Sequence, residues 1–218
     1  MKLSKRLLAI ASLVPQGCFC ADIGADHGYL ITYLAKNKLI EKGYASDNKK
    51  GPYLRLLETV KENSLSDVIE CSLKNGLTSL PTYINTCIIA GMGGDLISSI
   101  IEEGKEHLDH ISTFILSPHG LEESVRRKMD QLGYKLVNET VVFDEHYYEV
   151  LVFEKGHLKM DELDFKYGYF LRREKSEIFI LKYKDEIKKY SFILTNPLSK
   201  EKVNEIDRKI KELNEIIA

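Results

Sequence analysis

The chain has 218 residues, of which 44% are hydrophobic and 29% charged, and its formal net charge at pH 7 is −2. This composition belongs to a globular protein of roughly one to two domains and excludes a disordered or fibrous chain. The near-neutral charge also excludes a nucleic-acid binder that works through bulk positive charge, although it allows a local basic patch.

The first helix-like segment has two interpretations. Basic residues up to Arg6 precede an apolar stretch, which is how a secretion signal begins. The apolar residues recur at helical spacing, however, and Pro15 and Gln16 stand where a cleavage site needs small residues. We therefore favour an amphipathic helix over residues 4–14.

The cysteines and the hydropathy pattern bear on location. The four cysteines form no Cys-x-x-Cys pair and no Cys–His cluster with zinc spacing. No apolar run approaches the roughly 18–20 residues that span a bilayer. We expect reduced, buried thiols, no metal site, no membrane partner and a cytoplasmic protein.

Short apolar runs alternate with amphipathic segments along most of the chain. Strands are expected at residues 19–24, 44–47, 68–73, 86–91 and 112–117. Helices are expected after them, the first ending near residue 38 and the others at about 51–63, 95–103 and 122–132. Leu54, Leu57 and Val60 share one face of the second of these helices.

Two further strands at residues 134–143 and 147–155 have no helix between them and predict an antiparallel pair. The fold class is therefore α/β, with a mostly parallel sheet between helices and a reversed pair at its end. Rossmann-like class I methyltransferases have this arrangement, whereas dinucleotide dehydrogenases normally stay parallel throughout.

The pattern changes at Gly156. Residues 160–190 are charged and helix-like, and Asn196-Pro197 interrupts the pattern. Apolar residues then recur at helical steps, at Val203, Ile206, Ile210, Leu213 and Ile217. This seam predicts an α-helical coiled-coil hairpin. We assign residues 1–155 to a first domain and 156–218 to a second, and we favour a monomer over a hairpin that pairs with a partner.

The strongest candidate site is the sequence DIGADHGYL at residues 22–30. An acidic strand end, glycines in the turn and a helix start, here Asp22, Gly24 and Gly28, are typical of a cofactor loop at the carboxyl edge of a sheet. The spacing is not that of the dinucleotide motif. Asp26 would repel a pyrophosphate but attract a cationic sulfonium. A purely structural strand–helix turn is the alternative.

Polar and glycine residues also follow the next three strands. Asp47 ends the second strand, where it can bind ribose hydroxyls or cap a helix. Asn75-Gly76 follows the third strand, where an amide can bond an adenine edge or form a simple turn. Three residues stand at the end of the fourth strand, across the point where the strand order reverses: Gly91, Met92 and Gly93. Because the glycines have no side chain, this segment leaves room for a flat base beside a methyl donor. The alternative is that the glycines only allow the following helix to pack tightly.

Candidate substrate contacts are less specific. One group ends the fifth strand at the same edge: Ser117, Pro118 and His119. A second lies on a basic, aromatic helix face that can bind phosphates or simply be solvated: Arg172, Arg173 and Lys175. Among the histidines, His27 fits a structural hydrogen bond as well as a catalytic role.

A family resemblance follows from six segments in this order: DIGADHGYL (22–30), SDNKKGP (46–52), KNGL (74–77), AGMGGDLI (90–97), LSPHG (116–120) and YYEVLVF (147–153). They resemble the bacterial tRNA (adenine-22-N1)-methyltransferase family, TrmK, over about residues 3–155. The resemblance implies S-adenosyl-L-methionine as donor, tRNA as substrate and C-terminal helices that help to hold the tRNA. The implied cofactor contacts are Asp22, Gly24, His27, Gly28, Asp47, Asn75, Gly76, Gly91, Met92 and Gly93, and we add the neighbouring Asn48 as a candidate cofactor contact. The family pattern is not followed at Asn48, Asn75, Ser117 and His119.

For methyl transfer to adenine N1, whose lone pair needs no prior deprotonation, catalysis is mostly alignment. We expect Asp26 to act as the catalytic carboxylate and Tyr29 as a stacking or hydrogen-bonding partner. One alternative is a NAD-dependent oxidoreductase, disfavoured by the missing glycine and by Asp26. The other is an inactive coiled-coil or RNA-binding protein, which the departures at Asn75 and Ser117 favour. The enzymatic interpretation requires Gly24 and Gly93 to face one pocket.

Overall fold

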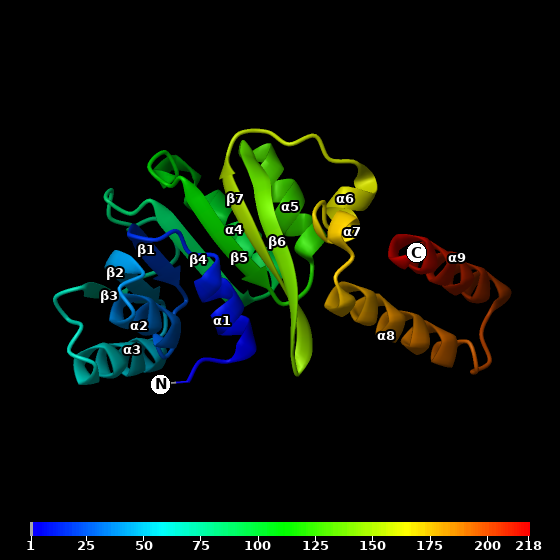
Figure 1. Cartoon of the computed structure of the whole chain (residues 1–218), viewed down its shortest axis with the longest axis horizontal. Helices are drawn as coiled ribbons and strands as arrows, with labels where there is room; N and C mark the ends of the chain where they lie inside the picture. Colours follow the sequence, from blue (N-terminus) through cyan, green and yellow to red (C-terminus); the bar gives the residue numbers. More distant parts are fainter. Residues whose placement is uncertain (1) are drawn as a thin grey trace.

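The computed structural model describes residues 2–218 (Figure 1). An N-terminal helix, α1 (Lys5–Ser12), precedes the sheet. The strands are β1 (Cys18–Ile23), β2 (Ile40–Asp47), β3 (Ile69–Leu73), β4 (Thr86–Met92), β5 (Thr113–Pro118), β6 (Tyr134–Asp144) and β7 (His146–Lys155). The helices among them are α2 (Tyr29–Lys36), α3 (Lys50–Glu62), α4 (Gly94–Glu103) and α5 (Glu122–Gln131), with a 3-10 turn at Lys105–His107.

The seven strands form one sheet in the order β3-β2-β1-β4-β5-β7-β6. Strands β1 to β5 are parallel, whereas β7 runs antiparallel to both β5 and β6. The predicted α/β class, a mostly parallel Rossmann-like sheet with a reversed pair at its end, is therefore confirmed. The strand order reverses between β1 and β4, so the first three strands extend to one side and the later strands to the other.

Helices cover both faces of the sheet. On one face, α1, α2 and α3 bury apolar side chains such as Ile10, Leu34 and Leu56. On the other, α4 and α5 bury Ile101 and Val125. Since the helices that follow β1 and β4 lie on opposite faces, the loops that lead into them diverge at the carboxyl edge of the sheet.

The buried face of α3 differs from the apolar face seen in the sequence. Leu54 and Leu57 are exposed, whereas Leu56 and Val60 are buried. Residues four apart lie on the same side of a helix, and here the side that contains Leu56 and Val60 faces the core. The helix carries two adjacent apolar rows, and only one of them faces the sheet.

Residues 160–190 do not form one continuous helix. They form α6 (Glu162–Tyr167), α7 (Leu171–Glu174) and α8 (Glu177–Ile193). The chain adopts positive φ angles between them, 94° at Gly168 and 45° at Lys175. A Cβ at position 168 would lie only 2.7 Å from Oε1 of Glu139, so the close passage over this carboxylate requires glycine.

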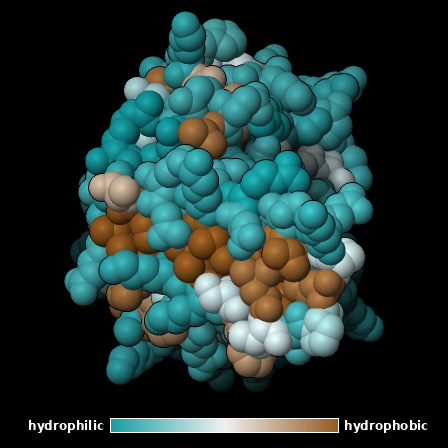
Figure 2. All heavy atoms as spheres, turned by 90° about the vertical axis from the view of Figure 1, so that its right-hand side faces the viewer, coloured by the Kyte–Doolittle hydropathy of each residue, from teal (hydrophilic) through white to brown (hydrophobic). Residues whose placement is uncertain are grey.

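The C-terminal helices α8 and α9 (Lys200–Ile217) form the predicted hairpin at the end of the molecule opposite α3 (Figure 1). Leu213 and Ile216 of α9 share a core with Tyr183 of α8 and Val141 of β6. Since this core also contains a residue of β6, the C-terminal helices do not pack only on one another. The domain boundary between residues 155 and 156 therefore stays a prediction, and so does the coiled coil. Figure 2 shows an apolar band on this end of the molecule. Within residues 2–218, no helix combines the length and apolar character that a bilayer span requires.

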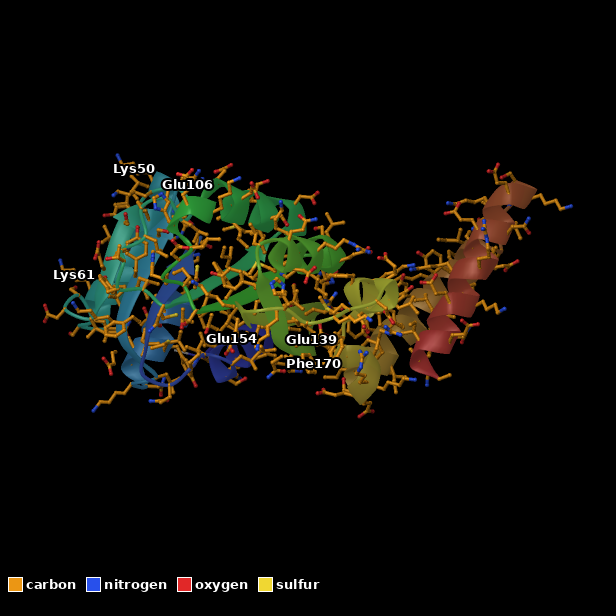
Figure 3. All side chains as sticks on the ribbon, turned by 90° about the horizontal axis from the view of Figure 1, so that it is seen from above. Lys50, Lys61, Glu106, Glu139, Glu154 and Phe170 are labelled. Carbon is orange, nitrogen blue, oxygen red and sulfur yellow. The ribbon has the colours of Figure 1, made fainter. Side chains whose placement is uncertain are left out.

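A buried ionic cluster joins the sheet to these C-terminal helices. Arg126 of α5 donates to Glu139 of β6, 2.7 Å away, and to Glu149 of β7, and none of the three side chains is more than 2% exposed. Lys182 of α8 lies 2.5 Å from the other oxygen of Glu149. Glu139 also accepts the backbone N–H groups of Phe170 and Leu171, at 2.7 and 3.3 Å. Figure 3 labels Glu139 and Phe170 at this junction.

The charges in this cluster compensate one another. Burial alone would raise the pKa of Glu149, but Lys182 and Arg126 outweigh it and hold that pKa below its usual value. At Glu139, burial outweighs Arg126 and raises the pKa. Both carboxylate oxygens of Glu139 nevertheless accept hydrogen bonds from N–H donors, two at each oxygen. A proton bound to either oxygen would therefore have no acceptor. We therefore describe both glutamates as ionised.

Replacing Arg126 with Met should strongly destabilise the protein, because two buried carboxylates would lose their shared cation. We expect the free energy of unfolding, measured by urea denaturation, to fall by about 3–5 kcal/mol. Arg127→Met is the matched control, since the ion pairs of Arg127 with Glu123 and Glu162 are solvent-exposed. It should cost about 1 kcal/mol or less. Equal losses in the two variants would contradict the assigned role of the cluster.

Candidate active site

The main cavity lies at the carboxyl edge of the sheet, where the strand order reverses. It has a volume of about 510 Å³. Its lining includes residues that follow β1, β2, β3 and β4, namely Ile23, Gly24, Asp26, Ser46, Asp47, Asn48, Lys49, Pro52, Arg55, Lys74, Asn75, Gly76, Gly91, Met92, Leu96 and Ile100. The loops after β1 and β4 thus meet in one pocket as predicted, although Gly91 and Met92, and not Gly93, face it.

A second cavity of about 280 Å³ adjoins the first and shares Gly24, Asp26 and Gly91 with it. Its remaining lining comes from α1, β1, the first loop, α2 and β4: Arg6, Leu7, Asp22, Ala25, His27, Tyr29, Leu30 and Ala90. The residues predicted from the first motif therefore divide between two connected spaces. Gly28 lines neither of them.

Gly24 holds the two loops in close contact. Its φ of +73° favours glycine, and a Cβ added there would lie 1.9 Å from Cε of Met92. Gly28 is similarly constrained, with a φ of +67° and Cδ1 of Leu56 2.4 Å from an added Cβ. The first glycine thus keeps the cavity open beside Met92, and the second lets α2 begin against α3.

Two carboxylates lie deep in the site. Asp22 is 5% exposed, and burial raises its pKa to about 7, against the opposing effects of Arg6 and the backbone N–H of Ile31. Asp47 accepts the backbone N–H groups of Lys49 and Asp26, at 2.9 and 3.4 Å. The side chain of Asp47 therefore holds the turn before α3 and also lines the main cavity. Lys49, and not Asp47, is the N-cap residue of α3, and the binding of ribose hydroxyls by Asp47 stays a prediction.

The rim of the main cavity is polar. The amide of Asn48 donates to Oδ1 of Asn75 at 3.3 Å, so the loops after β2 and β3 are linked. Asp26 is more exposed, at 55% of its side chain, and pairs with Arg55 at 2.7 Å. The ring of His27 stacks on that of Tyr29, with centroids 5.1 Å apart and an interplanar angle of 15°. These two rings offer a flat surface beside the second cavity.

The predicted residues of β5 lie next to the cavities and not in their lining. His119 donates its backbone N–H to the carbonyl of Met92 at 2.7 Å. Its ring lies edge-on to Tyr148, with centroids 5.1 Å apart. Ser117 and Pro118 are buried, and the hydroxyl of Ser117 has no hydrogen-bond partner within residues 2–218.

The predicted basic residues of the C-terminal segment lie apart from this site. Arg172 and Arg173 both pair with Asp164, at 2.6 and 2.8 Å, and Arg173 also stacks on Tyr169. With Lys175 they line a separate cavity of about 240 Å³. Their role in substrate binding stays a prediction, and the ion pairs give both arginines a structural role as well.

The sequence analysis missed several cationic residues of the site. Arg6 was assigned to an amphipathic helix, and nothing in its spacing connects it to the first loop. Three further cationic residues line the main cavity, namely Lys49, Arg55 and Lys74. Their sequence pattern predicts only a helix at its start and a turn, and it does not indicate a binding site. No group of three or more metal-ligating side chains occurs in the part of the chain that the structure describes.

A Rossmann-like sheet with a reversed terminal pair, and a two-part polar cavity at its switch point, together define the class I methyltransferase architecture. The sequence model of the TrmK family, described as tRNA (adenine(22)-N(1))-methyltransferase, matches residues 20–216. The tRNA (adenine(22)-N(1))-methyltransferase of Bacillus subtilis strain 168 is 31% identical, with 100% of this chain and 98% of that protein covered. The chain therefore belongs to the TrmK family.

Solved structures agree over the whole chain. Streptococcus pneumoniae Sp1610 is 33% identical, with a TM-score of 0.95 and 100% of both chains covered. The same protein in complex with S-adenosyl-L-methionine gives a TM-score of 0.92 at 32% identity, again with 100% of both chains covered. M. capricolum TrmK in complex with S-adenosyl-homocysteine is 26% identical, with a TM-score of 0.87 and coverage of 100% and 98%.

Two glycine variants test the contact between the loops. Gly24→Ala places a methyl group against Met92 at a positive φ, so we expect the free energy of unfolding to fall by about 1–3 kcal/mol. Gly93→Ala is the matched control, since an added Cβ at Gly93 meets nothing within 4 Å. It should cost about 0.5 kcal/mol, as the residue caps α4. Similar urea midpoints for the two variants would contradict this account.

Proposed function

We propose that this protein transfers a methyl group from S-adenosyl-L-methionine to N1 of adenine 22 in tRNA. The observation that carries the proposal is the pair of connected cavities where β1 and β4 diverge, in a chain of the TrmK family. When bound, the donor supplies an electrophilic methyl group on a sulfonium. We propose that the enzyme acts in the cytoplasm as a monomer.

The residues present fit such a donor. Asp47 can accept both hydroxyls of a ribose, and the amide of Asn75, which lines the same cavity, can bond an adenine edge. Gly24 leaves the space that a Cβ would occupy beside Met92. Asp22 and Asp26 place negative charge where the cationic part of the donor would lie.

The remaining residues align and stabilise the reacting base. Alignment of the N1 lone pair with the methyl–sulfur bond supplies most of the rate enhancement. Positive charge develops on the adenine during attack, and the exposed carboxylate of Asp26 lies beside both cavities to stabilise it. The stacked rings of His27 and Tyr29 provide a surface for the base.

The target base must leave the RNA stack, which costs a few kcal/mol and requires anchoring of the surrounding phosphates. Candidate anchors on the C-terminal segment are the predicted residues Arg172, Arg173 and Lys175. Lys184, Lys188 and Lys189 of α8 are exposed and add to this surface. Removal of the whole segment would uncover Glu149, so point substitutions test tRNA binding more cleanly than truncation.

The proposal is tested by incubating unmodified tRNA with the protein and labelled donor, then mapping methylated nucleosides by mass spectrometry. We expect 1-methyladenosine at position 22. The absence of any methylated nucleoside would support the alternative of an inactive RNA-binding protein. Binding of NAD instead of the methyl donor would support the oxidoreductase alternative.

Asp26→Asn should lower kcat by about 10- to 100-fold, because the amide cannot stabilise positive charge on the base. The dissociation constant of S-adenosyl-homocysteine should change much less, since Asp47 and Asn75 are untouched. Glu58→Gln, which removes an exposed carboxylate from the same neighbourhood on α3, is the control. Full activity of the Asp26 variant would remove this residue from the mechanism.

Replacing Lys184, Lys188 and Lys189 together with Gln should weaken tRNA binding. We expect the slope of log Kd against log salt concentration to fall by about 1 for each lost phosphate contact, as measured by filter binding. The same substitutions at Lys36, Lys38 and Lys61 are the control, because Lys61 lies at the opposite end of the molecule (Figure 3). If both triple variants bind equally, α8 does not contact tRNA.

A further inference from the structure

Strands β6 and β7 extend beyond the rest of the sheet at the edge that carries the candidate active site. Residues 151–154 of β7 pair with β5, whereas β6 and β7 remain paired as far as Asp144 and His146. Because β7 runs antiparallel to β5, its first residues lie at and beyond the carboxyl end of β5. This extension, residues 143–148, is the β6–β7 tip and lies between α1 and α8 (Figure 1).

The β6–β7 tip carries four aromatic or imidazole rings on its two faces. Phe143 and Tyr147 pair across the strands and share one face, with ring centroids 5.0 Å apart. His146 and Tyr148 lie on the opposite face, because side chains alternate along a strand, and their centroids are 6.3 Å apart. Phe143 is 47% exposed, so a large part of its ring is accessible to a ligand.

The face with Tyr148 adjoins the candidate active site. The guanidinium of Arg6 lies over the Tyr148 ring, 5.1 Å from its centroid, and the His119 ring stands edge-on to it. Arg6 in turn lines the second cavity. The β6–β7 tip therefore connects the active site to the surface on its other side.

The face with Tyr147 adjoins α8. The hydroxyl of Tyr147 donates to Asp185 at 2.7 Å, and a cavity of about 530 Å³ opens between the tip and this helix. The cavity is lined by Phe143, Glu145, His146, Tyr147, Asp185 and Lys189. Lys189 is one of the exposed lysines of α8 proposed above to contact phosphates. The cavity thus lies between the active site and this lysine surface.

The side chains around this cavity suit a nucleobase better than an isolated phosphate or an apolar segment. Glu145 and Asp185 would repel a phosphate, but their oxygens can accept hydrogen bonds from the amino groups of a base. The Phe143 ring offers a face for stacking, and Lys189 supplies a cation for the phosphate of the same nucleotide. An apolar protein segment would remove water from Glu145, Asp185 and Lys189 and would not replace its hydrogen bonds.

Extrusion of the target base gives such a surface a role. A base that leaves the stack exposes the faces of its neighbours, and unpaired bases in RNA stack readily on aromatic side chains. A ring beside the active site can replace the lost stacking contact and favour the opened form of the RNA.

We propose that the cavity between the β6–β7 tip and α8 binds an unpaired nucleobase near the target adenine of the tRNA, stacked on Phe143. The target base occupies the active site at the same time. This inference rests on the proposed function, because both bases belong to the same substrate.

Fluorescence tests the stacking directly. The chain contains no tryptophan, so Phe143→Trp introduces a single indole at the proposed site, and a base stacked on it quenches its emission. We expect unmodified tRNA to quench most of this emission and a fully paired RNA duplex of equal length to quench little. Tyr83→Trp is the matched control, because Tyr83 is 39% exposed and precedes β4 at the opposite edge of the sheet. Its emission should not respond to tRNA.

Phe143→Leu tests the energetic contribution of the ring, because it removes the face for stacking and keeps an apolar side chain. The KM for tRNA should rise by about 5- to 50-fold. The Kd of S-adenosyl-homocysteine, measured by calorimetry, should change by less than about twofold, since the variant is remote from both cavities at the switch point. Tyr83→Leu should methylate tRNA with the KM of the wild type.

Several outcomes would overturn the inference. An indole at position 143 that keeps its emission at saturating tRNA, or an unchanged KM for Phe143→Leu, excludes a base stacked there. A change in this emission with protein concentration in the absence of RNA would identify a second copy of the chain as the occupant. Equal losses of affinity for tRNA and S-adenosyl-homocysteine would show that Phe143 supports the fold of the site. Wild-type protein that methylates no tRNA rejects the proposed function, whereas normal methylation with an unresponsive indole rejects this inference alone.

Discussion

The site depends on one topological constraint, the reversal of strand order between β1 and β4. These two strands are adjacent and parallel, but α2 and α4 pack on opposite faces of the sheet, so the loops that follow the strands must separate. The space between them cannot be closed by helix packing. Gly24 and Met92 narrow this space without filling it, because an added Cβ at position 24 would collide with Met92. The two cavities and the carboxylates on their walls follow from this arrangement.

The second constraint is electrostatic and fixes the C-terminal helices. The reversed strands β6 and β7 supply Glu139 and Glu149, and α5 places Arg126 between them without exposure to solvent. Such a cluster is costly to break once formed, since either partner left alone would be a buried, unpaired charge. Lys182 extends the cluster to α8, and the backbone after Gly168 closes over Glu139. The hairpin is therefore attached to the sheet by buried ionic contacts and is not free to swing.

The sequence predicted the sheet well because its signals are local. Apolar runs, glycines at strand ends and two adjacent strands without a helix identified every strand and the reversed pair. The first loop, Asp47, Asn75 and Met92 were also placed correctly at one edge, since parallel strands end on the same side. Long-range contacts were not predictable in this way. Arg6 reaches the site only because α1 packs against β6 and β7, and Arg126 finds two glutamates on strands that follow it in the chain. The breaks at Gly168 and Lys175 likewise depend on tertiary contact.

The distribution of charge in the cavities bears on which cofactor they suit. A dinucleotide would place its pyrophosphate at the first loop, where Asp22, Asp26 and Asp47 all line the connected space. These three carboxylates would oppose two phosphates at the first loop, whereas the cations Lys49, Arg55 and Lys74 line the larger cavity and Arg6 lines the smaller one. A sulfonium donor carries a positive charge at its centre, an ammonium beside it and a single carboxylate at its end. The raised pKa of Asp22 agrees with a cationic ligand. Burial destabilises the ionised form of this carboxyl, and a positive charge bound beside it would stabilise that form again. The carboxylates at the ends of β1 and β2 and in the loop after β1 therefore favour a cationic donor over a dinucleotide at the first loop.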